Sequence, residues 1–144
     1  MAEQGTVELV ARLRKLARHL PAFEALGFTF GEWEPSRTRE DGVIVLGWFK
    51  PGPEAEAFLS DLGGWITPFD WPTWASGAEG QALLGHPEAV ASATADDLRR
   101  LLTVYVRAER FGDGTLAAAF DSGMLTAIVR RAAVLAAELD PDSG

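Results

Sequence analysis

Apolar residues recur every three or four positions along several stretches of the chain, which is the spacing of an amphipathic helix. The first of these stretches places four leucines on one helical face: Leu9, Leu13, Leu16 and Leu20. Basic residues occupy much of the opposite face, and Pro21 interrupts the pattern. The pattern predicts an N-terminal helix that packs its leucines against a partner.

Two helices with clearer sequence signals are predicted in the C-terminal half. Thr94 is a good N-cap, Asp96 and Asp97 complement the helix dipole, and an apolar stripe follows them. A last helix is predicted from Met124 to Leu139. We expect these two helices to form the centre of the core. Shorter helices are predicted over 54–62, from Pro72, from Pro87 and around Leu116 and Phe120.

One pair of segments has the composition of β-strands instead. The ranges 28–33 and 43–49 are rich in aromatic and β-branched residues, and Asp41-Gly42 suits a turn between them. Because two strands alone are only marginally stable, we expect the hairpin to lie against the helices, which would explain a second strand that is apolar on both faces. The predicted fold is mainly α, a compact helical single domain with one small β-hairpin, spanning 1–144 with a frayed tail over 140–144.

Composition and charge narrow the class of protein. The 144 residues are 47% hydrophobic and 24% charged, which fits one globular domain without a membrane span. The formal charge of −8 argues against nucleic acid as a partner. The chain has no cysteine, which excludes disulfides, thiolate nucleophiles and zinc ribbons and fits a cytoplasmic protein.

The segment PFDWPTW, residues 68–74, allows two interpretations. In the first it is scaffold: Asp70 caps a helix that begins near Pro72, and Trp74 covers an end of the core together with Phe69, Trp65 and the hairpin's Trp48. In the second it is an exposed recognition surface built from Asp70, Trp71 and Trp74.

Four arginines form a second candidate site. Arg107 and Arg110 end the helix that follows Thr94, and Arg130 and Arg131 lie on the last helix. If these converge, their guanidinium groups suit a phosphate or carboxylate ligand. The alternative is that the same arginines pair with Glu109, Asp113 and Asp121 within the chain. The candidate ligand-binding residues are therefore Asp70, Trp71, Trp74, Arg107, Arg110 and Arg131.

Catalytic and metal-binding patterns are not found in the sequence. His19 and His86 stand far apart and share no ligand spacing with another histidine or carboxylate, so both are interpreted as structural, and no metal or cofactor is predicted. The favoured function is a non-enzymatic binding or interaction module, with itself, another protein or a small anion as partner. The alternative is a small hydrolase or transferase with Asp70 or Glu109 as general base and Arg107 or Arg110 stabilising an oxyanion.

Several motifs resemble those of a family of small bacterial proteins catalogued as a domain of unknown function. They are FGEW, FDWPTW, and the spaced pattern that runs from RF through G.L, F..G.L and I.RR. The resemblance spans about residues 28–131. It implies a shared fold and brings no activity with it.

Overall fold

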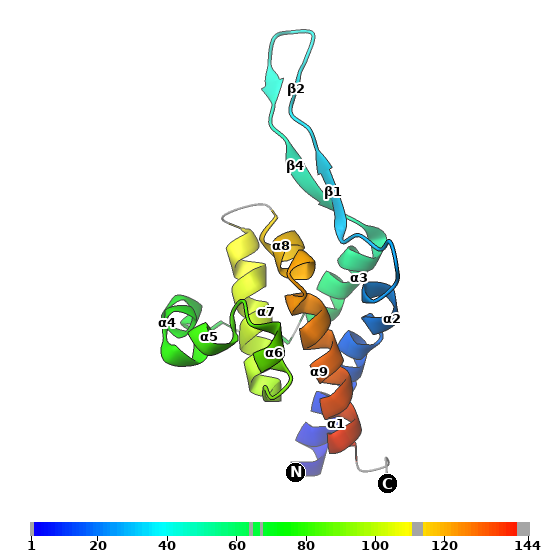
Figure 1. Cartoon of the computed structure of the whole chain (residues 1–144), viewed down its shortest axis with the longest axis vertical. Coiled ribbons are helices and arrows are strands. Elements are labelled where there is room, and N and C mark those ends of the chain that lie inside the picture. Colours follow the sequence, from blue (N-terminus) through cyan, green and yellow to red (C-terminus); the bar gives the residue numbers. More distant parts are fainter. Residues whose placement is uncertain (1, 64, 67, 111–113, 141–144) are drawn as a thin grey trace.

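The longest helices belong to the helical body of the molecule (Figure 1). In the computed structural model, which describes residues 2–63, 65, 66, 68–110 and 114–140, these are α1 (Ala2–Ala17), α7 (Ala95–Glu109) and α9 (Met124–Leu139). Helix α9 contacts α1, α2, α6, α7 and α8 and so lies at the centre of the body. The fold is mainly α, as predicted.

The core is built from the apolar stripes that the sequence pattern indicated. Side chains with no measurable exposure include Leu13 of α1, Leu98, Leu101 and Leu102 of α7, and Leu125, Ile128, Val129 and Ala132 of α9. Burial of such side chains is the main stabilising term of a domain of this size. The two predicted central helices are therefore confirmed at the centre of the core.

The start of α7 shows why its boundary could be predicted. The Thr94 hydroxyl accepts the Asp97 backbone N–H at 3.1 Å, and the Asp97 carboxylate accepts the Thr94 N–H at the same distance. This reciprocal capping box satisfies two backbone donors that a helix start leaves free. The predicted bounds of α9, Met124 to Leu139, are also confirmed.

Shorter helices complete the body. They are α2 (Leu20–Phe23), α3 (Pro53–Leu62), α4 (Trp71–Ser76), α5 (Ala78–Leu83), α6 (Pro87–Val90) and α8 (Thr115–Asp121). A proline stands in the first turn of α3, α4 and α6, where its missing N–H costs nothing. The predicted starts near residues 54, 72 and 87 are confirmed. The predicted tail lies, apart from Asp140, outside the described residues.

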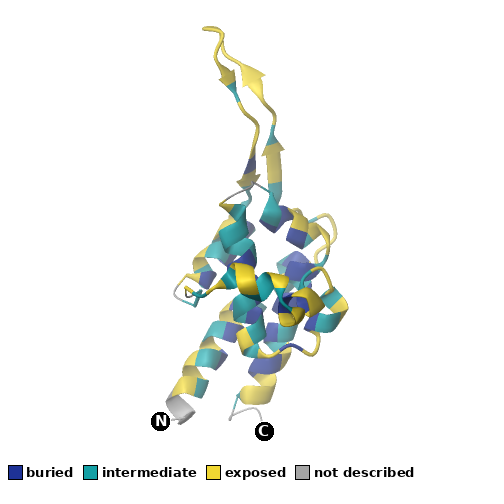
Figure 2. Ribbon diagram, turned by 90° about the vertical axis from the view of Figure 1, so that its left-hand side faces the viewer, coloured by how far each residue is buried: buried dark blue, intermediate teal, exposed yellow. Residues whose placement is uncertain are grey.

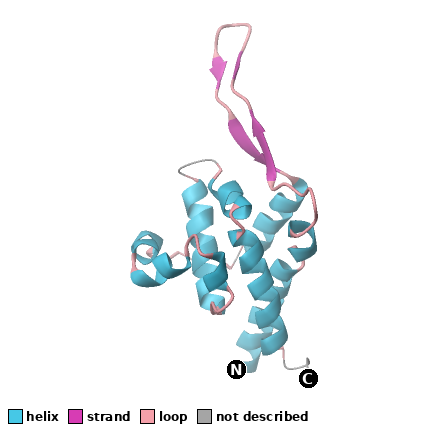
Figure 3. Ribbon diagram, viewed as in Figure 1, coloured by secondary structure: helices cyan, strands magenta, loops and turns pink. Residues whose placement is uncertain are grey.

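The hairpin extends away from the helices as a two-stranded arm, which we define as residues 31–51 (Figures 1 and 3). Its base pairs β1 (Gly31–Glu34) with β4 (Trp48–Pro51), and its outer part pairs β2 (Arg37–Thr38) with β3 (Ile44–Val45), both antiparallel. At the tip, Gly42 adopts a φ of 86°, which closes the turn that Asp41-Gly42 predicted.

The expected packing of the hairpin against the helices is wrong for most of its length. Only the base is anchored: Phe49 is 9% exposed, and Phe30, just before β1, packs with Phe23 and Phe120. Outer residues are exposed, as Figure 2 shows. A strand that is apolar on both faces predicts burial, but in the outer arm Val43, Ile44 and Leu46 are exposed.

Among the described helices, none combines the length and the apolar character that crossing a bilayer requires.

Candidate functional site

Two hollows on the surface of the helical body share Arg107 and Arg110 in their walls. The first has a volume of about 390 Å³ and lies between α3, α7 and α8. Its remaining lining is mostly apolar: Leu59, Leu62, Gly63, Ile66, Val106, Glu109 and Leu116. The two guanidinium groups therefore stand beside an apolar surface.

The second hollow, of about 530 Å³, is bounded by the aromatic segment. Its lining consists of Pro68, Phe69, Trp71, Pro72, Arg107 and Arg110. Helix α4 packs against α7, and this brings a segment that precedes Arg107 by more than thirty residues to the end of α7. The structure thus brings together three of the candidate residues, Trp71, Arg107 and Arg110.

The charges of the two arginines are not neutralised in the part of the chain that the structure describes. No described carboxylate lies within ion-pair distance of Arg107 or Arg110, although the structure contains many other ion pairs. Glu109, one of the expected partners, instead accepts the backbone N–H groups of Gly114 at 2.7 Å and Leu116 at 2.9 Å. Its carboxylate stabilises the positive N-terminal end of α8. The expected Glu109 pairing is wrong, and Asp113 lies outside the described residues.

The start of α8 also connects this region with the arm. Gly114 has a φ of 97°, and a Cβ placed on it would lie 2.5 Å from Cζ2 of Trp33. The Trp33 ring of the arm base therefore lies directly against the Gly114 backbone. A residue with a side chain fits neither the left-handed conformation nor this contact.

The other two arginines do not join the cluster. The guanidinium of Arg130 pairs with Glu24 at 2.7 Å. Arg131 donates from Nε to the carbonyl of Ala93 at 2.8 Å, just before the N-cap of α7. Since Arg107 stands fourteen residues further along, the two positions are roughly 20 Å apart along the helix. The four arginines therefore do not converge, and Arg131 lies away from the two hollows.

Asp70 has the structural role that the scaffold interpretation predicted. Its carboxylate accepts the Thr73 backbone N–H at 3.4 Å and the Thr73 hydroxyl at 2.7 Å, so it is the N-cap of α4. It does not line either hollow. Its described contacts are those of a helix cap.

Trp74 is partly buried and stands edge-on to Phe69, with the ring centres 6.3 Å apart. Its indole Nε1 is enclosed and has no hydrogen-bond partner within the described residues. The Arg99 guanidinium lies 5.8 Å from the centre of the Phe69 ring. The expected contribution of Trp48 is wrong, because Trp48 belongs to β4 of the arm and is 45% exposed.

The cluster around His19 was missed by sequence reasoning. His19 is 2% exposed, with Nδ1 at 2.6 Å from Glu54 and Nε2 at 2.6 Å from Asp61. Arg18 binds the same Asp61 carboxylate through two N–H groups at 2.9 Å. No local sequence pattern predicts these contacts, because Glu54 and Asp61 follow His19 by 35 and 42 residues.

The chemistry of this cluster is structural. Burial alone would raise the pKa of Asp61, but the hydrogen bonds from His19 and Arg18 outweigh it and hold that pKa below its ordinary value of 3.8. The two carboxylates approach opposite nitrogens, so they do not converge on one point as metal ligands do, and no metal-binding group is found among the described residues. The structural interpretation of His19 therefore has a specific basis.

His86 occupies the N-cap position of α6, as predicted, without a side-chain capping bond. Its ring is exposed and stands 3.3 Å from Glu88.

With this geometry in view, comparison with protein families gives one assignment. The chain belongs to a family of unknown function (DUF6508). The family model matches residues 8–138, which include the arm, both hollows and the described helices except the first residues of α1 and the last residue of α9. The predicted membership in a family of unknown function is confirmed. Searches of curated proteins and of solved structures gave no match.

Proposed function

We propose that this member of the family is a non-enzymatic binding module, and that the surface around Arg107 and Arg110 takes an acidic peptide segment of a protein partner. The observation that carries the proposal is the position of these arginines. They have no carboxylate partner among the described residues, and they stand between an apolar hollow and an aromatic one. A guanidinium group binds a carboxylate through two parallel hydrogen bonds.

The size and lining of the hollows favour a peptide over a free anion. A free anion would contact the arginines alone and leave hollows of about 390 and 530 Å³ open. An extended segment can place its carboxylate on the arginine pair and apolar side chains on Leu59 and Ile66 to one side and Trp71 to the other. Specific peptide sites commonly combine apolar pockets with a small number of charged contacts.

The hydrolase or transferase alternative has less support. Its two candidate bases, Asp70 and Glu109, are both engaged in hydrogen bonds at helix starts. A general base needs a carboxylate oxygen within reach of the substrate proton. Both carboxylates serve their helices instead, so no observation favours the catalytic role.

The proposal can be tested by titration with a defined probe. A short capped peptide of alternating leucine and glutamate is added to the labelled protein, and the Trp71 indole and Arg107 side-chain signals are followed by nuclear magnetic resonance. We expect saturable shifts of both, and a roughly tenfold or greater loss of affinity in Arg107→Ala, because one charged hydrogen-bonding partner is removed.

The matched control is Arg130→Ala, which removes the same charge from an exposed ion pair with Glu24. It is expected to bind the peptide as the wild type does. Equal affinity in Arg107→Ala would contradict the site. Inorganic phosphate binding as tightly as the peptide would contradict the peptide and leave a simple anion site.

A further inference from the structure

The two faces of the arm carry different sets of side chains. Glu34 faces Trp48 in the inner ladder. Thr38 faces Ile44 in the outer ladder, so the two ladders share one register. Because side chains alternate between the faces of a strand, this register assigns each side chain to one face. One of them, which we call the arginine face, holds Trp33, Pro35, Arg37, Arg39, Val43, Val45 and Phe49.

The charged side chains of the two strands on this face are both basic. They are Arg37 and Arg39, whereas the acidic residues of β1, Glu32 and Glu34, belong to the opposite face. Arg39 pairs with Asp41 of the turn at 3.1 Å. Arg37 is exposed and has no ion-pair partner among the described residues. In a chain with a formal charge of −8, this face is a local site of attraction for an anion.

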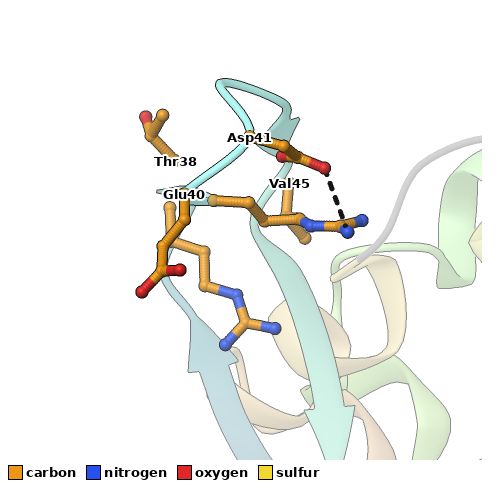
Figure 4. Close-up of a pocket in the computed structure, with 6 residues that line it drawn as sticks. Thr38, Glu40, Asp41 and Val45 are labelled. Atoms are coloured by element: carbon orange, nitrogen blue, oxygen red, sulfur yellow. Dashed lines mark ion pairs between the residues drawn. The ribbon is translucent and has the colours of Figure 1, made fainter.

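The outer part of the arginine face is hollowed (Figure 4). The hollow has a volume of about 710 Å³, and its lining consists of Arg37, Thr38, Arg39, Glu40, Asp41 and Val45. Val45 is half-buried, whereas its neighbours Ile44 and Leu46, on the opposite face, are exposed. The hollow therefore combines guanidinium groups with an apolar side chain, as the two hollows beside α7 do.

The base of the arginine face adjoins the hollow of about 390 Å³ between α3, α7 and α8. The Trp33 ring lies against the backbone of Gly114. Glu109, which accepts the N–H of Gly114, lines that hollow, and so does Leu116. Trp33 therefore connects the proposed peptide site with the arm. Arg37 follows Trp33 by four residues, which is roughly 13 Å along an extended strand.

We propose that the acidic segment bound at Arg107 and Arg110 continues past Trp33 along the arginine face and places a second carboxylate on Arg37. This inference rests on the proposed function and extends it. The partner is then an extended segment with two acidic positions and apolar residues between them, long enough to reach from the end of α7 to the outer arm.

Charge and lining both favour this occupant. A carboxylate complements the charge of Arg37, and the guanidinium group can bind it through two parallel hydrogen bonds. Apolar side chains of the same segment can cover Trp33, which is 59% exposed, and Val45. A phosphate backbone would neutralise Arg37 but would leave this apolar surface in water, so a protein segment fits the arginine face better than a nucleic acid does.

The test compares peptides of two lengths. The short peptide of alternating leucine and glutamate is extended by about eight residues, roughly 26 Å, that end in two glutamates. One version carries the extension at its N-terminal end and another at its C-terminal end. We expect the wild type to bind one of them roughly tenfold or more tightly than the short peptide, because the second contact forms within the same complex. An extension that ends in two glutamines should bring no such gain.

Arg37→Ala identifies the arm residue by isothermal titration calorimetry. We expect this variant to bind the short peptide as the wild type does and to lose the gain of the extended one. The side chain is exposed, so its replacement leaves the fold intact. Lys50→Ala is the matched control, because it removes the same charge from the opposite face of the arm, and it should keep the gain.

The outcomes separate this inference from the site on which it rests. A short peptide that fails to bind the wild type would overturn both. A short peptide that binds, with no gain from either extension, would overturn the arm contact alone. A gain that persists in Arg37→Ala, or that disappears equally in Lys50→Ala, would also overturn the arm contact alone.

Discussion

The imidazole of His19 holds two carboxylates of one helix at the same time. Glu54 and Asp61 are seven residues apart on α3, so both project from the same face, two turns from each other. Each ring nitrogen lies 2.6 Å from an oxygen of one of the two carboxylates. The ring and Arg18 together join α3 to the junction between α1 and α2.

Asp61→Asn tests the energetic contribution of this cluster. Because the pKa of Asp61 is held below 3.8, its carboxylate stabilises the fold above that pH, and this stabilisation is lost as the pH falls through the lowered value. At about pH 7 we expect the variant to lose about 2 kcal/mol of unfolding free energy, as is usual for hydrogen bonds to a charged group. The loss should shrink as the pH falls below 3.8.

Urea denaturation across this pH range measures the effect. Asp96→Asn is the control, because Asp96 is 66% exposed and its ion pairs with Arg99 and Arg100 contribute little. A loss in Asp61→Asn that is the same at acidic and neutral pH would show that the carboxylate charge is not the cause.

Trp74 decides between the scaffold and recognition interpretations of the aromatic segment. The side chain is only partly buried, so Trp74→Ala is expected to lose about 3 kcal/mol, the lower end of the range for a large aromatic. Trp74→Phe should lose less than about 1 kcal/mol, because the enclosed indole N–H has no described partner to forfeit. Chemical denaturation compares the two; an unchanged stability in Trp74→Ala would favour an exposed recognition surface.

At the level of elements, local signals determined most of what could be predicted. The start of α7 depends on Thr94 and Asp97, three residues apart, and α9 depends on a stripe of apolar residues at helical spacing. The predicted packing of the arm against the helices was wrong, because it depends on contacts that are not local. Its turn at Gly42 is local and was correct, but whether an apolar strand is covered depends on the path of the whole chain.

In the candidate site, too, local features could be predicted and contacts between distant segments could not. That Asp70 caps a helix follows from its place before Pro72, and the structure confirms it. That Trp71 lies beside Arg107 depends on the packing of α4 against α7, which no spacing encodes. Whether Arg131 joins Arg107 depends in the same way on helix packing: its position two turns into α9 places it at the opposite end of α7.

At the scale of the molecule, the buried core and the outer arm are separated in space. The cluster of buried apolar residues comes from the helical body together with Phe49 at the base of the arm and Phe30 just before it. The outer arm contributes no residue to that cluster within the described chain. The body therefore holds the fold, and the described core does not depend on the outer arm.

This separation predicts that the outer arm can be removed without unfolding the body. Residues 35–47 are replaced by Asn-Gly, a two-residue turn that joins Glu34 and Trp48, which already face each other in the ladder. We expect the unfolding free energy to change by less than about 1 kcal/mol, because the removed side chains are mostly exposed and a shorter loop costs slightly less entropy to close. Urea denaturation is measured at concentrations below those of any self-association.

Phe49→Ala provides the contrast at the base of the same arm. Phe49 is 9% exposed and packs edge-on against Trp33 at 5.3 Å, so its loss should cost about 3 kcal/mol. A comparable loss in the trimmed chain would show that the outer arm packs on the body in solution. If instead the trimmed chain is as stable as the full one, the outer arm is not maintained for folding.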